Sequence, residues 1–148
     1  IAGSDWSSDV CSSDLMEQRN IHLQKKYDII KENEVRFEKT NLDDADYVIV
    51  AFGSVARISE KAVELAREEG IKVGLFRPIT LWPFPEKEIA ELAKTKKGFL
   101  VAELNAGQMI EDVRLAVNGE TKVAHFGRLG GMVPDPEEIV NALKEELL

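Results

Sequence analysis

The stretch that decides the fold is YVIVAFGS, residues 47–54. It opens with six apolar residues in a row, which is typical of a strand covered on both faces. Gly53 breaks the run, Ser54 is expected to cap a following helix, and Gly70 is expected to end that helix. Between them, apolar side chains recur at helical spacing, namely Val55, Ile58, Ala62, Leu65 and Ala66. A buried strand followed by an amphipathic helix indicates an α/β protein.

The same pattern occurs three more times towards the C-terminus. Strands are expected over residues 71–76, 99–104 and 122–126. Helices are expected to follow, with Pro85 in the first turn of one, another over residues 108–117, and a last one capped by Asp135. Gly98 and the pair Asn118-Gly119 are expected to terminate two of them. Four strand–helix units predict a three-layer α/β/α sandwich with a mostly parallel sheet.

Residues 16–40 are interpreted as a connecting helix and linker, so that the α/β domain is expected to span residues 41–148. Leu23, Tyr27 and Ile30 lie at i, i+4 and i+7, which gives one apolar helix face suited to packing against a neighbour. Val35 and Phe37 then alternate with charged residues, which indicates a short extended segment. That segment is a candidate antiparallel edge strand.

Residues 1–15, IAGSDWSSDVCSSDL, show no helix or strand period and contain a near-repeat of Ser-Ser-Asp. The segment resembles translated sequencing-adapter DNA, so it is interpreted as non-native and left out of the fold prediction. The alternative is a natural flexible tail. In both cases no chemistry is assigned to Trp6 or Cys11.

The composition limits the classes of function. A net charge of −8 argues against a nucleic-acid or anionic-membrane partner, because both require clustered Lys and Arg. A single cysteine leaves no internal disulfide and no cysteine pair for zinc or an iron–sulfur cluster, which favours a reducing, cytoplasmic compartment. The sequence has no apolar run of about 18 residues and no recognisable secretory signal.

Ligands of open α/β sheets usually bind beyond the carboxyl ends of the strands, so the residues there are the site candidates. Gly53 and Ser54 open a helix N-terminus, which either is a plain capped turn or binds an anion. Glu103 either acts as a general acid or base, or is a structural carboxylate bonded to loop N–H groups or to Arg128. Arg77 and Asn105 complete the set of strand-end candidates.

No catalytic, cofactor-binding or metal-binding residue is assigned from these patterns. The sequence lacks a G-x-G-x-x-G and a Walker motif, and His125, in an expected strand, is interpreted as structural. The proline-rich stretch 76–85 carries Trp82 and Phe84, which either dock on a neighbouring domain or subunit, or fold back onto the domain itself.

Four separated stretches carry a family resemblance: AFGSVARI (51–58), FRPITLWPFP (76–85), VAELNAGQMIEDVRLAVNG (101–119) and FGRLGGMVPDPEEI (126–139). With them, the chain from about Arg19 onwards resembles the C-terminal region of the alpha subunit of 2-oxoacid:ferredoxin oxidoreductases. The ketoisovalerate (3-methyl-2-oxobutanoate) type is the nearest, and the 2-oxoglutarate type is second. The resemblance implies a transketolase C-terminal-like fold.

The resemblance also implies an enzyme that oxidatively decarboxylates a 2-oxoacid to an acyl-CoA and reduces ferredoxin. The resemblance implies that an upstream pyrimidine-binding domain of the same subunit holds the aminopyrimidine of thiamine diphosphate. A separate beta subunit binds its diphosphate through Mg²⁺, and iron–sulfur clusters carry the electrons. This sequence has no Gly-Asp-Gly motif, no cysteine cluster and no upstream domain before Met16. The fragment is therefore expected to bind no cofactor, to be inactive alone, and to serve structure and subunit or domain interfaces.

Two alternative interpretations assign the chain to other functional classes. A freestanding anion- or nucleotide-binding module would use Gly53, Ser54 and Arg128. A receiver-type signalling domain would need an aspartate for phosphorylation where the third strand instead ends in Glu103. Transketolase, deoxyxylulose phosphate synthase and the beta subunit of pyruvate dehydrogenase are other possible parents, although the loops at 82–83 and 127–131 favour the ferredoxin-linked enzymes.

Overall fold

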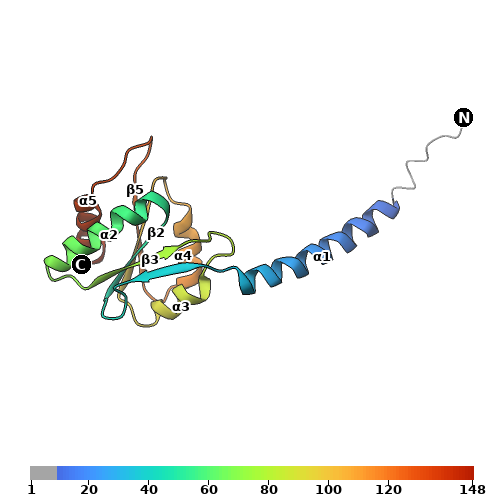
Figure 1. Cartoon of the computed structure of the whole chain (residues 1–148), viewed down its shortest axis with the longest axis horizontal. Coiled ribbons are helices and arrows are strands. Elements are labelled where there is room, and N and C mark those ends of the chain that lie inside the picture. The colour runs from blue at the N-terminus through green and yellow to red at the C-terminus, as the bar shows by residue number, and fades with distance from the viewer. Residues whose placement is uncertain (1–9) are drawn as a thin grey trace, which may run out of the picture. The chain divides into compact units, whose positions relative to one another are not determined.

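The computed structural model describes residues 10–148, and the chain forms two units, one ending at Glu34 and one spanning Val35–Leu148. The first unit holds a single helix, α1 (Val10–Asn33), drawn in blue in Figure 1. The second holds a five-stranded sheet and four helices. Within residues 10–148, every helix is too short or too polar to span a lipid bilayer.

Helix α1 confirms the helix expected after Met16, but it begins earlier. It includes residues 10–15 of the segment that was left out of the fold prediction, and residues 1–9 lie outside the described part of the chain. No glycine or proline interrupts residues 10–33, and each added residue contributes a hydrogen bond once a helix exists. The helix therefore continues into a stretch whose composition alone predicts nothing regular.

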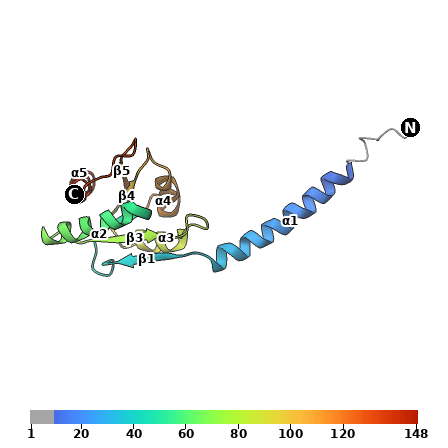
Figure 2. The ribbon, with the colours of Figure 1, turned by 45° about the horizontal axis from the view of Figure 1, so that its top comes forward.

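The sheet has the order β1-β3-β2-β4-β5, visible in part in Figures 1 and 2. Four strands run parallel, and they are β2 (Tyr47–Ala51), β3 (Val73–Pro78), β4 (Gly98–Glu103) and β5 (Lys122–Gly127). The edge strand β1 (Phe37–Thr40) pairs antiparallel with β3. This confirms an antiparallel edge strand, although the strand lies two residues later than the extended segment expected at 35–37.

Two of the boundaries that differ from the sequence-based expectation follow from specific contacts. Because β1 belongs to the sheet and Phe37 stacks on Phe76 at 5.3 Å between ring centroids, the compact unit begins at Val35 rather than at residue 41. Strand β3 begins at Val73 rather than Ile71. The Ile71 N–H still belongs to the end of α2, where it bonds to the Ala66 carbonyl, and the Val73 N–H bonds back to the Ile71 carbonyl at 3.0 Å.

Helices cover both faces of the sheet, which confirms the three-layer α/β/α sandwich. Helices α2 (Gly53–Glu68) and α5 (Pro136–Leu147) pack on one face, and α3 (Glu86–Ala93) and α4 (Met109–Val117) on the other (Figure 1). Along β2, Ile49 and Ala51 face the α2/α5 layer, whereas Val48 and Val50 face the α3/α4 layer. The unbroken apolar run of residues 47–52 therefore reflects burial on two sides.

The expected helix ends are confirmed in three cases. Helix α4 ends at Val117, with Asn118 as its left-handed C-cap at φ +50° and Gly119 next to it, as expected. After α2, Gly70 has φ +84°, its N–H bonds to the Arg67 carbonyl, and the Ile71 N–H bonds to the Ala66 carbonyl, which is a Schellman ending. Before α5, Asp135 accepts the N–H of Glu138 and the Glu138 side chain bonds back to the Asp135 N–H, with Pro136 in the first turn.

Three other expected helix boundaries were wrong by one to several residues. The N-cap of α2 is Phe52, so Ser54 lies inside the first turn and makes no capping bond. Pro85 is the N-cap of α3 rather than a residue of its first turn. Gly98 does not end α3, which stops at Ala93; it is buried as the first residue of β4, paired with both Tyr47 and Lys122.

Arg67 of α2 fastens the β1–β2 connection to the start of β3. Its guanidinium donates to the Val73 carbonyl at 2.7 Å, to the Asn41 carbonyl at 2.7 Å and to both carboxylate oxygens of Asp44 at 2.6 and 3.1 Å. These hydrogen bonds hold the pKa of Asp44 below its usual value of 3.8 and raise the pKa of Arg67.

The Asp44 pair predicts a specific sensitivity to acid. A carboxylate whose pKa is lowered by folding contributes stability that is present above the unfolded pKa, and this contribution is lost as the pH falls through the lowered value. We expect thermal unfolding midpoints to fall more steeply below about pH 3.8 in the wild type than in Asp44→Asn. The neighbouring variant Asp43→Asn should keep the wild-type slope; equal slopes for all three proteins would contradict the assignment.

Two buried glycines provide a matched test of packing. A Cβ on Gly74 would lie 2.5 Å from the Asn41 carbonyl oxygen, which is backbone, whereas a Cβ on Gly98 would lie 3.0 Å from a methyl carbon at the end of the Leu147 side chain. Gly74→Ala should therefore lower the free energy of unfolding by about 2 kcal/mol or more, and Gly98→Ala by clearly less. Urea unfolding followed by circular dichroism measures both, and equal losses would contradict this reading of the two contacts.

Candidate functional site

The carboxyl edge of the sheet collects the residues singled out from the sequence. Because β2, β3, β4 and β5 are parallel, their C-terminal ends lie on one edge. The order β1-β3-β2-β4-β5 makes β2 and β4 neighbours, with Ala51 opposite Ala102. The start of α2 at Gly53 and Ser54 and the loop that follows Glu103 therefore leave the sheet from adjacent strands.

Glu103, the last residue of β4, is fully buried and holds the start of α4. Its carboxylate accepts the N–H of Met109 at 2.7 Å, of Ile110 at 3.2 Å and of Gln108 at 3.2 and 3.3 Å. The Asn105 side-chain amide donates to it at 3.3 Å. Carboxylate oxygens are suitable acceptors at this position, because the first N–H groups of a helix lack partners within it.

These contacts favour the interpretation of Glu103 as a structural carboxylate. A carboxylate offers about four lone-pair directions, and four donors already occupy them. The loop N–H groups are the partners, while the alternative partner Arg128 bonds elsewhere. The geometry thus gives Glu103 a structural setting, with its oxygens bonded to the loop and helix rather than directed at a ligand.

Asn105 shapes the same loop. Its side-chain oxygen accepts the Gly107 N–H at 2.7 Å, which closes a tight turn, while its amide reaches Glu103. The glycine at 127 leaves room for this turn, because a Cβ there would lie 2.4 Å from the Asn105 carbonyl oxygen. Glu103, Asn105 and the start of α4 therefore form one hydrogen-bonded unit.

His125, on the neighbouring strand β5, lies next to this unit. Its Nε2 atom lies 3.6 Å from a Glu103 carboxylate oxygen, and Nε2 is buried without a hydrogen-bond partner in the structure. The sequence analysis did not predict this proximity, because the two residues are 22 positions apart and meet only through the pairing of β4 with β5. The signal that could have found it is that both residues lie near the ends of adjacent expected strands.

The two arginine candidates are already engaged by carboxylates. Arg128 forms a two-pronged contact with Glu138 of α5, and Arg77 bonds Glu38 of β1 at 2.9 Å, with its Nε buried and making no hydrogen bond. Neither guanidinium is placed beside Gly53 and Ser54 by any contact in the structure. The start of α2 has no side-chain cap, and both of these residues are exposed there.

In the proline-rich loop after β3, one aromatic side chain folds back onto the domain and the other is exposed. Phe84 is half-buried and packs on the α3/α4 layer, so this aromatic side chain folds back. Ile79, Leu81 and Trp82 remain 49%, 46% and 55% exposed. The loop is held by the Thr80 hydroxyl, which donates to the Pro83 carbonyl at 3.0 Å, and the Trp82–Pro83 peptide bond is cis.

Other loops at the same edge also expose large apolar side chains, which the sequence reading missed. They are Leu104 after β4, and Leu129, Met132 and Val133 between β5 and α5. A sequence signal was present, since three large apolar residues stand in a glycine-rich turn where no strand or helix could bury them. We call these residues, together with Ile79, Leu81 and Trp82, the apolar rim.

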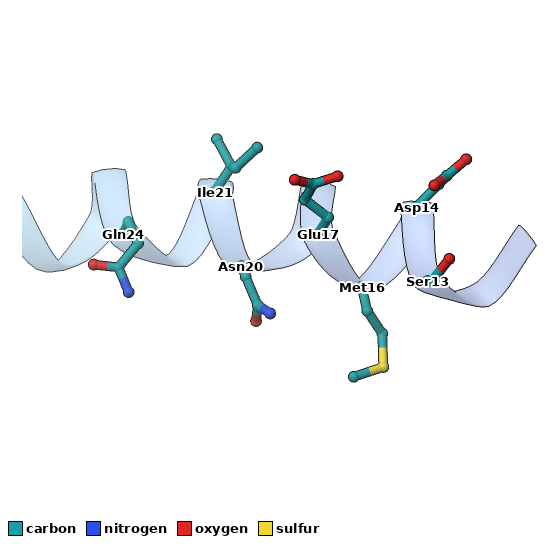
Figure 3. A pocket seen from close by; sticks show the side chains of 7 residues that line it. All are labelled: Ser13, Asp14, Met16, Glu17, Asn20, Ile21 and Gln24. Atoms are coloured by element: carbon teal, nitrogen blue, oxygen red, sulfur yellow. The ribbon is translucent and has the colours of Figure 1, made fainter. Parts of the chain in front are cut away.

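Two hollows on the surface offer little chemistry. One follows α1, and Figure 3 shows that its side chains all come from that helix, with Met16 and Asn20 pointing to one side and Ile21 to the other. It therefore has no opposing wall. The other lies between α2 and α5, where Leu65 and Val140 stand among Glu68, Glu69 and Glu137. Within residues 10–148 no three His, Cys, Asp or Glu side chains are grouped to hold a metal ion.

The comparisons with known structures define the class of the domain. A 2-oxoglutarate:ferredoxin oxidoreductase from Magnetococcus marinus, whose structure was solved with 2-oxoglutarate, coenzyme A and succinyl-CoA bound, matches with a TM-score of 0.69 and 26% identity. The match covers 93% of this chain and 24% of that one. A split-gene transketolase, an inactive beta4 tetramer, matches with a TM-score of 0.63 and 20% identity over 74% of this chain and 41% of that one. The fold is that of a transketolase C-terminal-like α/β domain.

The sequence comparisons identify the family. Residues 45–139 match the family described as pyruvate:ferredoxin oxidoreductase core domain II. Ketoisovalerate oxidoreductase subunit VorB from Methanothermobacter marburgensis and from Methanothermobacter thermautotrophicus are 43% and 46% identical over 132 residues. The 2-oxoglutarate synthase subunit KorA of M. marburgensis is 38% identical over 109 residues, 74% of this chain and 29% of KorA. The chain belongs to the 2-oxoacid:ferredoxin oxidoreductase family.

The chain spans only part of these relatives. The alignments with VorB cover 89% of this chain but 37% of the VorB subunits. Enzymes of this family use thiamine diphosphate and iron–sulfur clusters, and the residues present here do not fit those groups. The sequence has one cysteine and no Gly-Asp-Gly motif, and the described residues contain no cluster of metal ligands.

Removing the Glu103 carboxylate tests its structural setting. Glu103→Ala would leave buried N–H groups of Met109 and Ile110 without a partner, so we expect a loss of about 3 kcal/mol in the free energy of unfolding. The matched control is Glu111→Ala in the first turn of the same helix, where an exposed ion pair with Arg114 should contribute no more than about 0.5 kcal/mol. Urea unfolding gives both values. A Glu103 variant as stable as the control would contradict the structural role of this carboxylate.

Proposed function

We propose that this chain is the C-terminal α/β domain of the alpha subunit of a ketoisovalerate (3-methyl-2-oxobutanoate) type 2-oxoacid:ferredoxin oxidoreductase, and that it provides structure and interfaces rather than catalytic groups. The reaction of the whole enzyme in this proposal is the thiamine-diphosphate-dependent oxidative decarboxylation of a branched 2-oxoacid to an acyl-CoA with reduction of ferredoxin. The enzyme would work in the cytoplasm.

One observation carries the proposal: the alignment with the VorB subunits covers 89% of this chain at 43–46% identity. The 2-oxoglutarate type is supported less, since KorA of M. marburgensis aligns over 74% of the chain at 38% identity. Ketoisovalerate oxidoreductase subunit VorA of Pyrococcus abyssi also matches, at 41% identity over 68 residues. Assignment to the alpha subunit rests on the motif resemblance given above.

The non-catalytic role is supported by the hydrogen bonds and ion pairs that already engage the polar groups at the carboxyl edge. Glu103 is saturated by backbone and amide donors, and Arg77 and Arg128 are paired with Glu38 and Glu138. What remains at this edge is largely apolar, as the exposed side chains of the apolar rim indicate. A surface of that kind suits docking, because large exposed apolar patches mark interaction sites in soluble proteins.

In this proposal the partners are the upstream pyrimidine-binding domain of the same subunit, the beta subunit and further oxidoreductase subunits. Coenzyme A and ferredoxin interact with the assembled enzyme. The freestanding anion- or nucleotide-binding module has no observation in its favour, because neither arginine candidate is joined to the start of α2 by a contact in the structure.

The proposal predicts that the 148-residue chain folds but has no cofactor site. Circular dichroism should show a cooperative thermal transition, while isothermal titration calorimetry with thiamine diphosphate and Mg²⁺ should show no binding at micromolar concentrations. No 2-oxoacid should be consumed with coenzyme A and an electron acceptor present. The complete oxidoreductase, assayed in parallel, is the positive control, and micromolar cofactor binding by the folded chain would refute the proposal.

A further inference from the structure

We propose that the β5–α5 loop, residues 128–135, is a preformed apolar knob that inserts into an apolar pocket on the rest of its own oxidoreductase subunit. The inference rests on the proposed function and deepens it by naming the surface. Leu129, Met132 and Val133 are 60%, 58% and 65% exposed. In Figure 1 the loop between β5 and α5 projects beyond the neighbouring helices.

The tip of the loop has a conformation that its sequence specifies. Gly130 and Gly131 have φ +66° and +79°, and the Met132 N–H bonds to the Leu129 carbonyl at 3.3 Å. A turn with positive φ at both central positions is readily adopted by glycine and by few other residues. Leu129 and Met132 therefore flank a defined turn.

Both ends of the loop are fastened to one carboxylate. The Arg128 guanidinium contacts both oxygens of Glu138, and the Asp135 N–H bonds to Glu138 Oε2 at 3.1 Å. Pro134, next to the tip, is buried. Because the loop is ordered before it meets a partner, docking does not require the entropy loss of ordering a flexible segment.

The charges of the loop indicate what covers it. Arg128 and Asp135 are its only charged residues, and both are used inside the domain, Arg128 by Glu138 and Asp135 by the capping of α5. The tip thus offers apolar side chains and no unpaired charge, which suits an apolar pocket. Methionine fills irregular gaps well because its side chain is flexible and polarizable.

The length of the relatives indicates where that pocket lies. This chain accounts for 37% of the VorB subunits that it matches, so most of such a subunit lies outside it. A covalently tethered neighbour is present at an effective concentration that a separate molecule rarely reaches. We therefore assign the pocket to the same subunit rather than to a second copy or a separate partner.

Cysteine labelling measures the insertion directly. Met132→Cys is placed in the 148-residue chain and in the complete subunit, and alkylation by iodoacetamide is followed by mass spectrometry of the labelled peptide. We expect labelling in the complete subunit to be slower by about tenfold or more, the protection expected of a side chain held in a pocket. Leu115→Cys on α4, where the native side chain is 77% exposed, should be labelled at similar rates in both proteins.

Two further variants test whether the turn is preformed. A Cβ on Gly131 meets no atom within 4 Å, so Gly131→Ala changes the backbone preference without a clash. It should restore fast labelling of Met132→Cys in the complete subunit, whereas Gly131→Asn should keep the protection, because asparagine tolerates positive φ. Neither variant should unfold the 148-residue chain, as circular dichroism would show.

Each other result would overturn the inference. Equal labelling of Met132→Cys in both proteins means that the loop is not inserted. Protection that appears only when companion subunits are added assigns the pocket to another subunit, and protection of the 148-residue chain at high concentration assigns it to a second copy. These outcomes leave family membership and the cofactor prediction untouched, since calorimetry tests the proposed function separately.

Discussion

The arrangement of this domain depends on the burial of its central strands on both faces. The side chains of Val48, Ile49 and Val50 in β2 and of Leu100 and Val101 in β4 are completely buried. A strand with two apolar faces requires a layer of helices on each side, because one uncovered face would expose several large side chains to water. Parallel pairing of such strands then needs a helical crossover after each one, and these crossovers bring the strand C-termini to a common edge.

At that edge the domain uses its own carboxylates where helices begin. Glu103 accepts the first N–H groups of α4, and Asp135 with Glu138 caps α5. A buried anion with several N–H donors is well compensated, and it fixes the connection between strand and helix. This use of polar groups fits a domain whose edge is a rigid surface. The same positions in other α/β proteins often bind phosphate, which shows that the fold alone does not determine the activity.

The matches to both an oxidoreductase and a split-gene transketolase also show that a shared fold does not imply a shared activity. The two solved structures share the sheet and its helices with this chain, at 26% and 20% identity. The family is identified by the sequence match over residues 45–139, which includes the loops at the carboxyl edge. The layers are set by apolar periodicity that many sequences satisfy, whereas loops such as 79–85 and 128–135 carry residues with no role in the layers. Their exposed apolar side chains suit contact with another surface.

The sequence by itself determined the fold class, the four strand–helix units and the Gly70 and Asp135 helix boundaries, because these follow from local periodicity and from capping chemistry. It did not locate the start of α1, the N-cap of α2 or the role of Gly98, since these depend on helix propagation and strand pairing. For the candidate site, the sequence pointed to Glu103 and its loop N–H partners. It could not show that Arg128 bonds Glu138, that His125 lies 3.6 Å from Glu103, or that Phe84 is half-buried while Trp82 is exposed. These contacts join residues that only the packing of strands and helices brings together, so the tertiary structure decided them.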